Sequence, residues 1–137
     1  MLGQMKQQGV EKQQAAFDSV MMKSIQQSGA QVDPNNIPAS LGGIVANAML
    51  ATITEAKNHG KQVPPQVVLK SATNVAREFI MSLGVPEQEV DNVLGQTFSV
   101  AMEQFLMIAQ DAITEEERQK YVGFVQFLAD KMSQGGQ

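Results

Sequence analysis

The sequence predicts an all-α protein, a bundle of about five helices joined by short loops. The 137 residues include 18 Gln and 9 Met, two unbranched residue types that lose little side-chain entropy in a helix. Apolar residues recur with helical spacing along most of the chain, and the alternating, β-branched runs that indicate strands are missing. Prolines at expected starts and glycines at expected stops divide the chain into segments of helical length.

We expect a single all-helical domain over residues 11–132, between flexible tails at 1–10 and 133–137. A chain of this length suits one compact domain with its own hydrophobic core. Residues 1–10 contain two glycines and three glutamines with little periodic pattern, and the last five residues contain two more glycines. Both ends are therefore predicted to be loose.

The first helix is expected over residues 11–28, with Gly29 as its stop. Its apolar face is thin and lies among many glutamines, so one hypothesis is that this face meets a partner subunit. The residues of the face are Phe17, Val20, Met21 and Ile25. They follow the spacing of an amphipathic helix.

A loop with the turn sequence Asp33-Pro34-Asn35-Asn36 comes next. The second helix is expected over residues 39–58, with Gly60 as its stop. The third helix follows the Val63-Pro64-Pro65 segment, where a proline in the first turn costs no hydrogen bond, and it stops at Gly84.

The fourth helix is expected to begin at Pro86 and to continue for about seven turns to Ala112. Acidic residues in its first turns favour this start, because the N-terminal end of a helix is partly positive. The fifth helix has the clearest start signal, the Thr114-Glu115-Glu116-Glu117 capping box. Its apolar residues extend from Tyr121 to Met132.

Composition excludes many kinds of chemistry. The net charge of −4 argues against broad nucleic-acid binding, and the lack of Cys excludes disulfides and thiol catalysis. His59 is the only imidazole, and with Glu55 it supplies too few ligands for an ordinary metal site. We therefore expect no enzyme activity, no catalytic residues, no cofactor, no metal and no small-molecule substrate.

The most unusual segment is the run from Asn35 to Thr54, which contains no charged residue. Small residues recur there at a spacing of four, and such spacing lets two helices approach closely. One interpretation is a central helix buried on all sides; the others are burial in an oligomer and entry into a membrane, because the run reaches spanning length. The residues expected to make this contact are Gly42, Gly43, Ala46, Asn47, Met49, Leu50 and Ile53.

In style, the chain resembles the small Gln-, Met- and Ala-rich helical proteins of tailed-bacteriophage particles, both the internal or ejected proteins and those associated with the portal or tail. The resemblance covers the Gln-rich segment from Gln4 to Gln31, the small-residue helix at 39–58, the Gly-Gly-Gln end, and the absence of Cys and Trp. It implies a structural role in many copies and, for ejected members, contact with host membranes.

The function expected from the sequence is that of a non-enzymatic structural or interaction protein in a homo-oligomer or larger assembly. Its partners would be copies of itself or other structural proteins, located in a virion or the host cytoplasm. No apolar run of signal-peptide length is present near the start. The alternatives are a membrane-active protein whose helix 39–58 inserts into or perforates a bilayer, and a small adaptor or inhibitor that binds a host protein.

Overall fold

The protein folds into five helices, and the part of the chain described by this computed structural model contains no strand. Residues 2–28, 32–33, 35–61 and 63–135 are described. The helices are α1 (Leu2–Ser28), α2 (Ile37–Asn58), α3 (Pro65–Ser82), α4 (Glu87–Ile108) and α5 (Glu115–Gly135). The predicted all-α bundle is confirmed.

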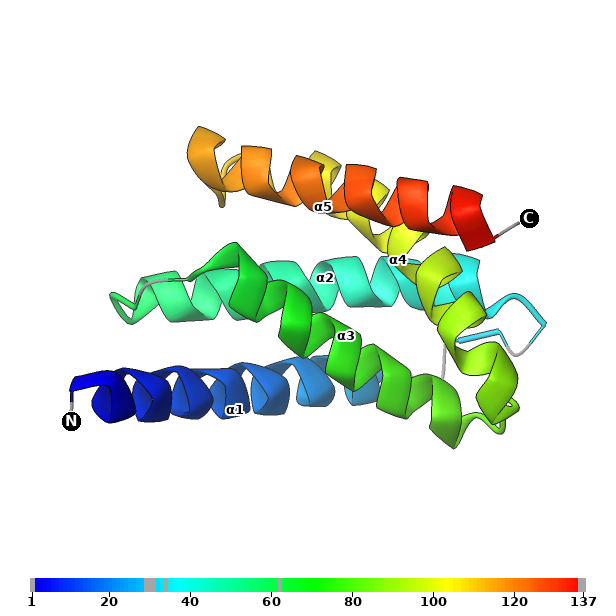
Figure 1. Ribbon diagram of the computed structural model, residues 1–137, viewed down its shortest axis with the longest axis horizontal. Coiled ribbons are helices and arrows are strands. Elements are labelled where there is room, and N and C mark those ends of the chain that lie inside the picture. Colours follow the sequence, from blue (N-terminus) through cyan, green and yellow to red (C-terminus); the bar gives the residue numbers. More distant parts are fainter. Residues whose placement is uncertain (1, 29–31, 34, 62, 136–137) are drawn as a thin grey trace.

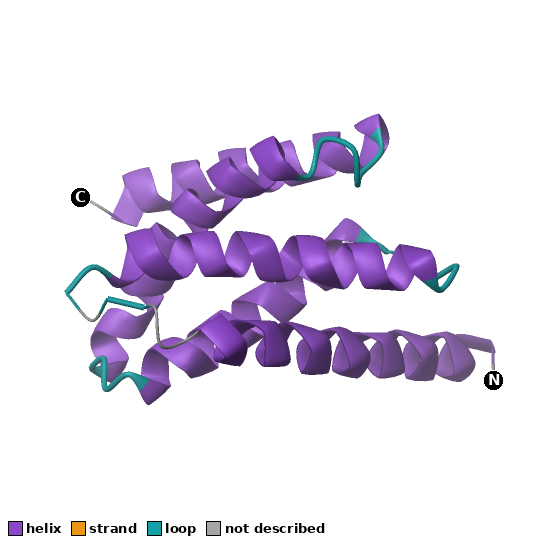
Figure 2. Ribbon diagram, turned by 180° about the vertical axis from the view of Figure 1, so that it is seen from behind, coloured by secondary structure: helices purple, strands orange, loops and turns teal. Residues whose placement is uncertain are grey.

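The helices form a stack in which α1 and α5 lie on opposite sides (Figure 1). α1 packs against α2 and α3, α2 packs most extensively against α4, and α5 packs against α4 and α3. Figure 2 views the bundle from behind and shows α2 in front, between α1 and the pair formed by α4 and α5. α2 is therefore central in the stack, although one of its sides faces outward.

Two glycines end helices as the sequence predicts. Gly60 follows α2 with a φ of 70°, and Gly84 follows α3 with a φ of 86°. This left-handed region is accessible to glycine at little cost, so the chain can reverse direction at both places. Pro38 and Pro65 lie in the first turns of α2 and α3, where a missing amide hydrogen leaves no intrahelical bond unmade.

Three helix boundaries differ from the sequence prediction by three residues or more. α1 begins at Leu2 rather than near Glu11, since the residues between are mostly good helix formers. α5 continues to Gly135, beyond the expected end near Met132. α4 ends at Ile108 instead of Ala112, because the chain turns at Ala109 before the capping box that starts α5.

The core joins all five helices in one hydrophobic cluster. Two aromatic pairs attach α5 to α4: Phe105 with Tyr121, at 4.8 Å between ring centroids, and Phe98 with Phe124, at 6.2 Å. Both pairs have the edge-to-face geometry that aromatic rings favour. Burial raises the pKa of the Tyr121 phenol above its ordinary value, and the nearby Glu117 carboxylate raises it further.

Candidate interaction surface

The inward side of α2 makes a close helix contact with α4 at Gly42. A Cβ at this position would lie only 2.6 Å from Cγ1 and 2.7 Å from Cβ of Val100. Glycine therefore lets the two backbones approach where any side chain would hold them apart. The close approach expected from the small residues of α2 is confirmed at this position.

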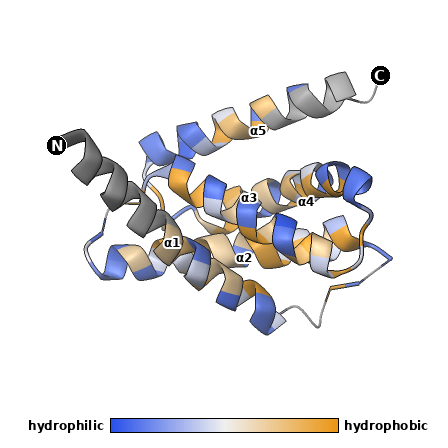
Figure 3. Cartoon of the chain, turned by 60° about the horizontal axis from the view of Figure 1, so that its bottom comes forward, coloured by the Kyte–Doolittle hydropathy of each residue, from blue (hydrophilic) through white to orange (hydrophobic). Residues whose placement is uncertain are grey.

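The residues expected to make the contact divide between two sides of α2. Gly42, Ala46, Met49 and Ile53 are buried inside the bundle, Gly43 and Leu50 are half-buried, and Asn47 is exposed. The interpretation of α2 as a helix buried on all sides is therefore wrong. In Figure 3, α2 is drawn in tan and orange where it passes through the middle of the bundle.

A row of residues at a spacing of four, which we call the outward ridge, runs along the exposed side of α2. Residues four apart lie one above the other on a helix, so the ridge is continuous. Gly43 is half-buried in the row and the other members are exposed. The members are Ala39, Gly43, Asn47, Ala51, Glu55 and His59.

A shallow groove of about 500 Å³ follows the C-terminal half of the outward ridge. Of the residue types Asp, Glu, Lys and Arg, its lining contains only Glu55, near one end. The lining residues are Asn47, Leu50, Ala51, Thr54, Glu55, Asn58 and His59.

Asn47 does not have the buried environment expected for a lone polar residue in an apolar helix. Its side chain is exposed, and its amide nitrogen Nδ2 donates a hydrogen bond to the Gly43 carbonyl at 3.0 Å. This bond to the preceding turn holds the short side chain close to the helix surface. The side chains of the ridge therefore project little from the helix at Asn47.

α2 and α4 run in the same direction along their contact. Gly42 is next to Val100 near one end of the contact, and the Lys57 Nζ atom bonds the Ala112 carbonyl near the other, so the two helices run in the same direction. Met107 and Ile108 are located between these two levels and are 69% and 43% exposed.

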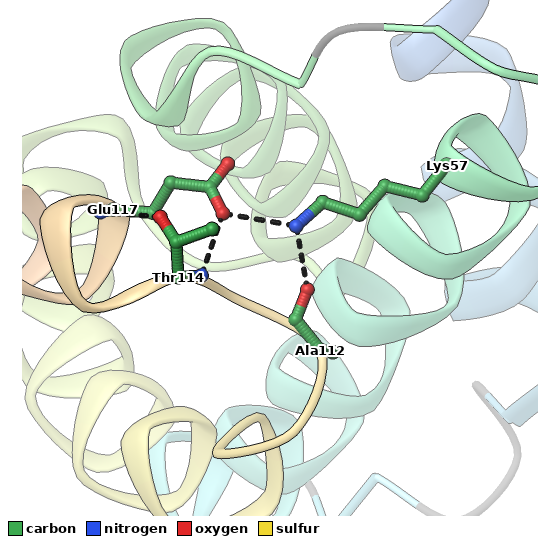
Figure 4. A network of polar contacts seen from close by, with 4 residues as sticks. All are labelled: Lys57, Ala112, Thr114 and Glu117. Atoms are coloured by element: carbon green, nitrogen blue, oxygen red, sulfur yellow. Dashed lines mark hydrogen bonds and ion pairs between the residues drawn. The ribbon is translucent and has the colours of Figure 1, made fainter.

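A polar network fixes the C-terminal end of α2 to the start of α5 (Figure 4). Lys57 Nζ donates hydrogen bonds to the Ala112 carbonyl at 2.7 Å and to Glu117 Oε1 at 2.9 Å. The same Glu117 oxygen accepts the Thr114 amide at 2.8 Å, and Thr114 Oγ1 accepts the Glu117 amide at 3.1 Å. The predicted capping box is therefore confirmed, with Lys57 as an additional member.

The Glu117 carboxyl titrates below its ordinary range. Partial burial raises its pKa, but hydrogen bonds from the Thr114 amide and Lys57, together with the Lys57 charge, outweigh burial and lower the pKa overall. A carboxyl whose pKa is lower in the folded state stabilises the fold above its unfolded pKa of about 4.3 and loses this effect as the pH falls through the folded pKa.

Replacing Glu117 by alanine is expected to lower the free energy of unfolding by about 1 kcal/mol at pH 7, since it removes half of the capping box and the partner of Lys57. The difference from wild type should be constant above about pH 5 and shrink below about pH 4, as the wild-type carboxyl becomes protonated. Urea melts at several pH values measure both effects. The exposed neighbour Glu116 supplies the control E116A, and an equal loss in both variants would contradict the network.

The apolar face of α1 belongs to the core of this chain. Phe17, Met21 and Ile25 are buried in the common hydrophobic cluster, and Val20 is half-buried. The hypothesis that this face meets a partner subunit is therefore wrong for these three buried residues, because helices of the same chain cover them.

No cluster of metal-ligating side chains forms within the described ranges. His, Asp and Glu side chains nowhere assemble there into a set of three that could hold a metal ion. His59 and Glu55 are both exposed members of the outward ridge. Their placement makes them surface groups beside the groove.

One helix of the described chain, α2, is long and apolar enough to cross a membrane by length and composition. Half of its most apolar window is buried inside the bundle. Core helices of soluble proteins meet the same criterion, so this is weak evidence for membrane insertion.

Sequence reasoning detected the uncharged run but not the surface that it forms. The row Gly43, Asn47 and Ala51 is visible in the sequence, but Ala39, Glu55 and His59, which continue its spacing of four, are not among the expected contact residues. That spacing was the signal that could have identified them. No family model, curated protein or solved structure matches the chain.

Proposed function

We propose that the protein is a non-enzymatic structural protein that works through helix packing, in a homo-oligomer or on a larger assembly. The observation that supports this proposal is the outward ridge of α2, which is exposed and contains no charged residue before Glu55. The solvent side of a surface helix ordinarily contains charged residues. A partner can cover an uncharged ridge without removing charges from water, as in the cores of protein interfaces.

The specific form that we propose is a virion component of a tailed bacteriophage, either internal and ejected or associated with the portal or tail. Its support is the style of the sequence: rich in Gln and Met, without Cys or Trp, with a small-residue helix in the middle. In this role the protein would meet many copies of itself and other structural proteins, in the virion or the host cytoplasm.

Multi-angle light scattering at increasing protein concentration tests the proposal. The expected result is a mass above the monomer value of 14.8 kDa that grows with concentration. A constant monomer mass would contradict the homo-oligomer. If such a monomer formed a complex with a single host protein, the adaptor or inhibitor alternative would be supported instead.

A second candidate function is membrane activity, which the length and apolar composition of α2 favour. Dye-loaded phospholipid vesicles distinguish it from the first proposal. Release of dye by the protein would support insertion of α2, whereas intact vesicles together with an oligomeric mass would support a packing role alone.

A further inference from the structure

We propose that α5 is an arm that two copies of the chain exchange. α4 and α5 join into one continuous helix through residues 109–114, a change that we call opening, and each α5 then packs on α4 of the other copy. This inference rests on the proposed homo-oligomer and names the element that is exchanged. It starts from the hairpin in which Phe105 meets Tyr121 and Phe98 meets Phe124, so that α4 and α5 run antiparallel, as Figure 1 shows.

The connection between α4 and α5 contains neither a glycine nor a proline. The other three connections contain both, as in Gly60 and Pro64 between α2 and α3. None of residues 109–114 has a positive φ. Ala109, at the end of α4, has a φ of −98° and a ψ of 12°, next to the right-handed helical region. The backbone of this connection therefore contains no feature that forbids a continuous helix.

Two cationic side chains hold the turn in place. Lys57 Nζ of α2 donates a hydrogen bond to the Ala112 carbonyl at 2.7 Å (Figure 4), and Arg118 Nη1 of α5 donates one to the Leu106 carbonyl at 3.2 Å. In a continuous helix each of these carbonyls accepts the backbone amide of the residue four positions further on. Opening therefore replaces both bonds by helical ones and leaves neither carbonyl unpaired.

The rings that opening uncovers select a second copy as the occupant. Separation of α5 from α4 leaves Phe98 and Phe105 without their partners Phe124 and Tyr121. The α5 of another open copy presents the same two rings at the same spacing, so it restores both edge-to-face pairs. Exchange of an identical element is a low-cost route to a dimer because it reuses contacts that the monomer already makes.

Glu115→Pro separates the closed form from the open form. Glu115 is the first residue of α5, where a proline costs no hydrogen bond. In the continuous helix the same proline lies in the interior, where it removes a backbone bond and clashes with the preceding turn. E115P should therefore stay monomeric at concentrations at which wild type dimerises. E115A removes the same side chain but keeps the amide, so this control should dimerise as wild type does.

Thr114→Ala and Lys57→Ala should act in the opposite direction. T114A removes the hydroxyl that accepts the Glu117 amide, and alanine is the better helix former. K57A removes the bond to the Ala112 carbonyl and the ion pair with Glu117. Each should lower the dimer dissociation constant about tenfold, measured by analytical ultracentrifugation. K70A removes an exposed lysine of α3 and, as the control, should leave the constant unchanged.

The distance between Gln96 of α4 and Gln126 of α5 distinguishes exchange from any other dimer. Both residues are exposed, and in the hairpin they lie across from each other beside the Phe98–Phe124 pair. Spin labels attached through Q96C and Q126C of one chain, diluted into excess unlabelled wild type, should be about 45 Å apart in the dimer, because a helix rises about 1.5 Å per residue. In E115P the labels should show only the short distance of the hairpin.

The outcomes separate this inference from the proposed function. Loss of the dimer in E115P but not in E115A, with the long distance in the wild-type dimer, would support the exchange. An oligomer with only the short distance, and with a mass that E115P leaves unchanged, would overturn the exchange and leave the proposed function standing. Monomers at every concentration in wild type, T114A and K57A would overturn both.

Discussion

Replacing Gly42 by alanine is expected to lower the free energy of unfolding by about 1 to 3 kcal/mol, the usual effect of overpacking a filled core. The new methyl group would lie within 2.7 Å of two Val100 carbons and 3.2 Å from the Ala101 amide nitrogen. These atoms sit on or next to the backbone of α4, so the helix itself has to move. The better helix propensity of alanine, about 1 kcal/mol, does not compensate.

Gly43→Ala is the matched control for this prediction, because it makes the same chemical change one residue further on. The nearest atom to its methyl group is Gln104 Oε1 at 3.1 Å, the tip of an exposed side chain that can rotate away. G43A should therefore raise stability by up to about 1 kcal/mol. Urea melts followed by circular dichroism, at concentrations that keep the chain monomeric, measure the free energy of unfolding. We expect this free energy to fall in G42A and to rise in G43A. A G42A variant as stable as wild type would contradict the close approach.

Replacing Phe105 by alanine is expected to cost about 3 to 5 kcal/mol, the range for truncating a buried aromatic residue. Phe105 is fully buried, and its ring meets Tyr121 at 4.8 Å and an interplanar angle of 64°. The variant leaves a cavity and also removes this ring contact. Urea melts measure the change as a lower midpoint with an unchanged slope.

A domain of this size is stable by only about 5–15 kcal/mol, so F105A could leave little folded protein. Phe105→Leu keeps part of the buried volume and should show a smaller loss of the same sign. The control is Met81→Ala, because Met81 is 52% exposed and should change stability by no more than about 0.5 kcal/mol. A loss below 1 kcal/mol in F105A would show that α5 does not bury this ring in solution.

The sequence predicts the start or stop of a helix well where the hydrogen bonds that fix it join residues only a few positions apart. The Thr114–Glu117 capping box is an example, because both of its hydrogen bonds join residues three apart. The end of α4 was harder to predict. Ala109 and Ile113 are buried in the turn that follows Ile108, so their apolar character continues the helical pattern although the helix has ended. A hydrophobic pattern records burial and does not distinguish a buried turn from one more turn of helix.

The side of α2 that faces inward could not be predicted for a related reason. Two rows of small residues, one through Gly42 and Ala46 and the other through Gly43, Asn47 and Ala51, are offset by a single position and have the same spacing. The second row reaches a charged residue only at Glu55, beyond the uncharged run from Asn35 to Thr54, so within that run no charge assigns either row to solvent. The contact of α2 with α4 determines which row faces the core, because Val100 lies against Gly42 there. This pairing joins residues far apart in the sequence, so the local pattern does not predict it.

The position of Tyr121 provides an optical reporter for one specific event. The chain contains one Tyr and no Trp, so its intrinsic fluorescence arises almost entirely from this residue. Tyr121 is 1% exposed and packs on Phe105 of α4. Tyrosine emission therefore follows the separation of α5 from α4, whereas the far-ultraviolet signal follows all five helices. If α5 detaches before the other helices unfold, the unfolding curve from tyrosine emission separates from the one from far-ultraviolet circular dichroism. If the bundle unfolds in one step, the two unfolding curves coincide.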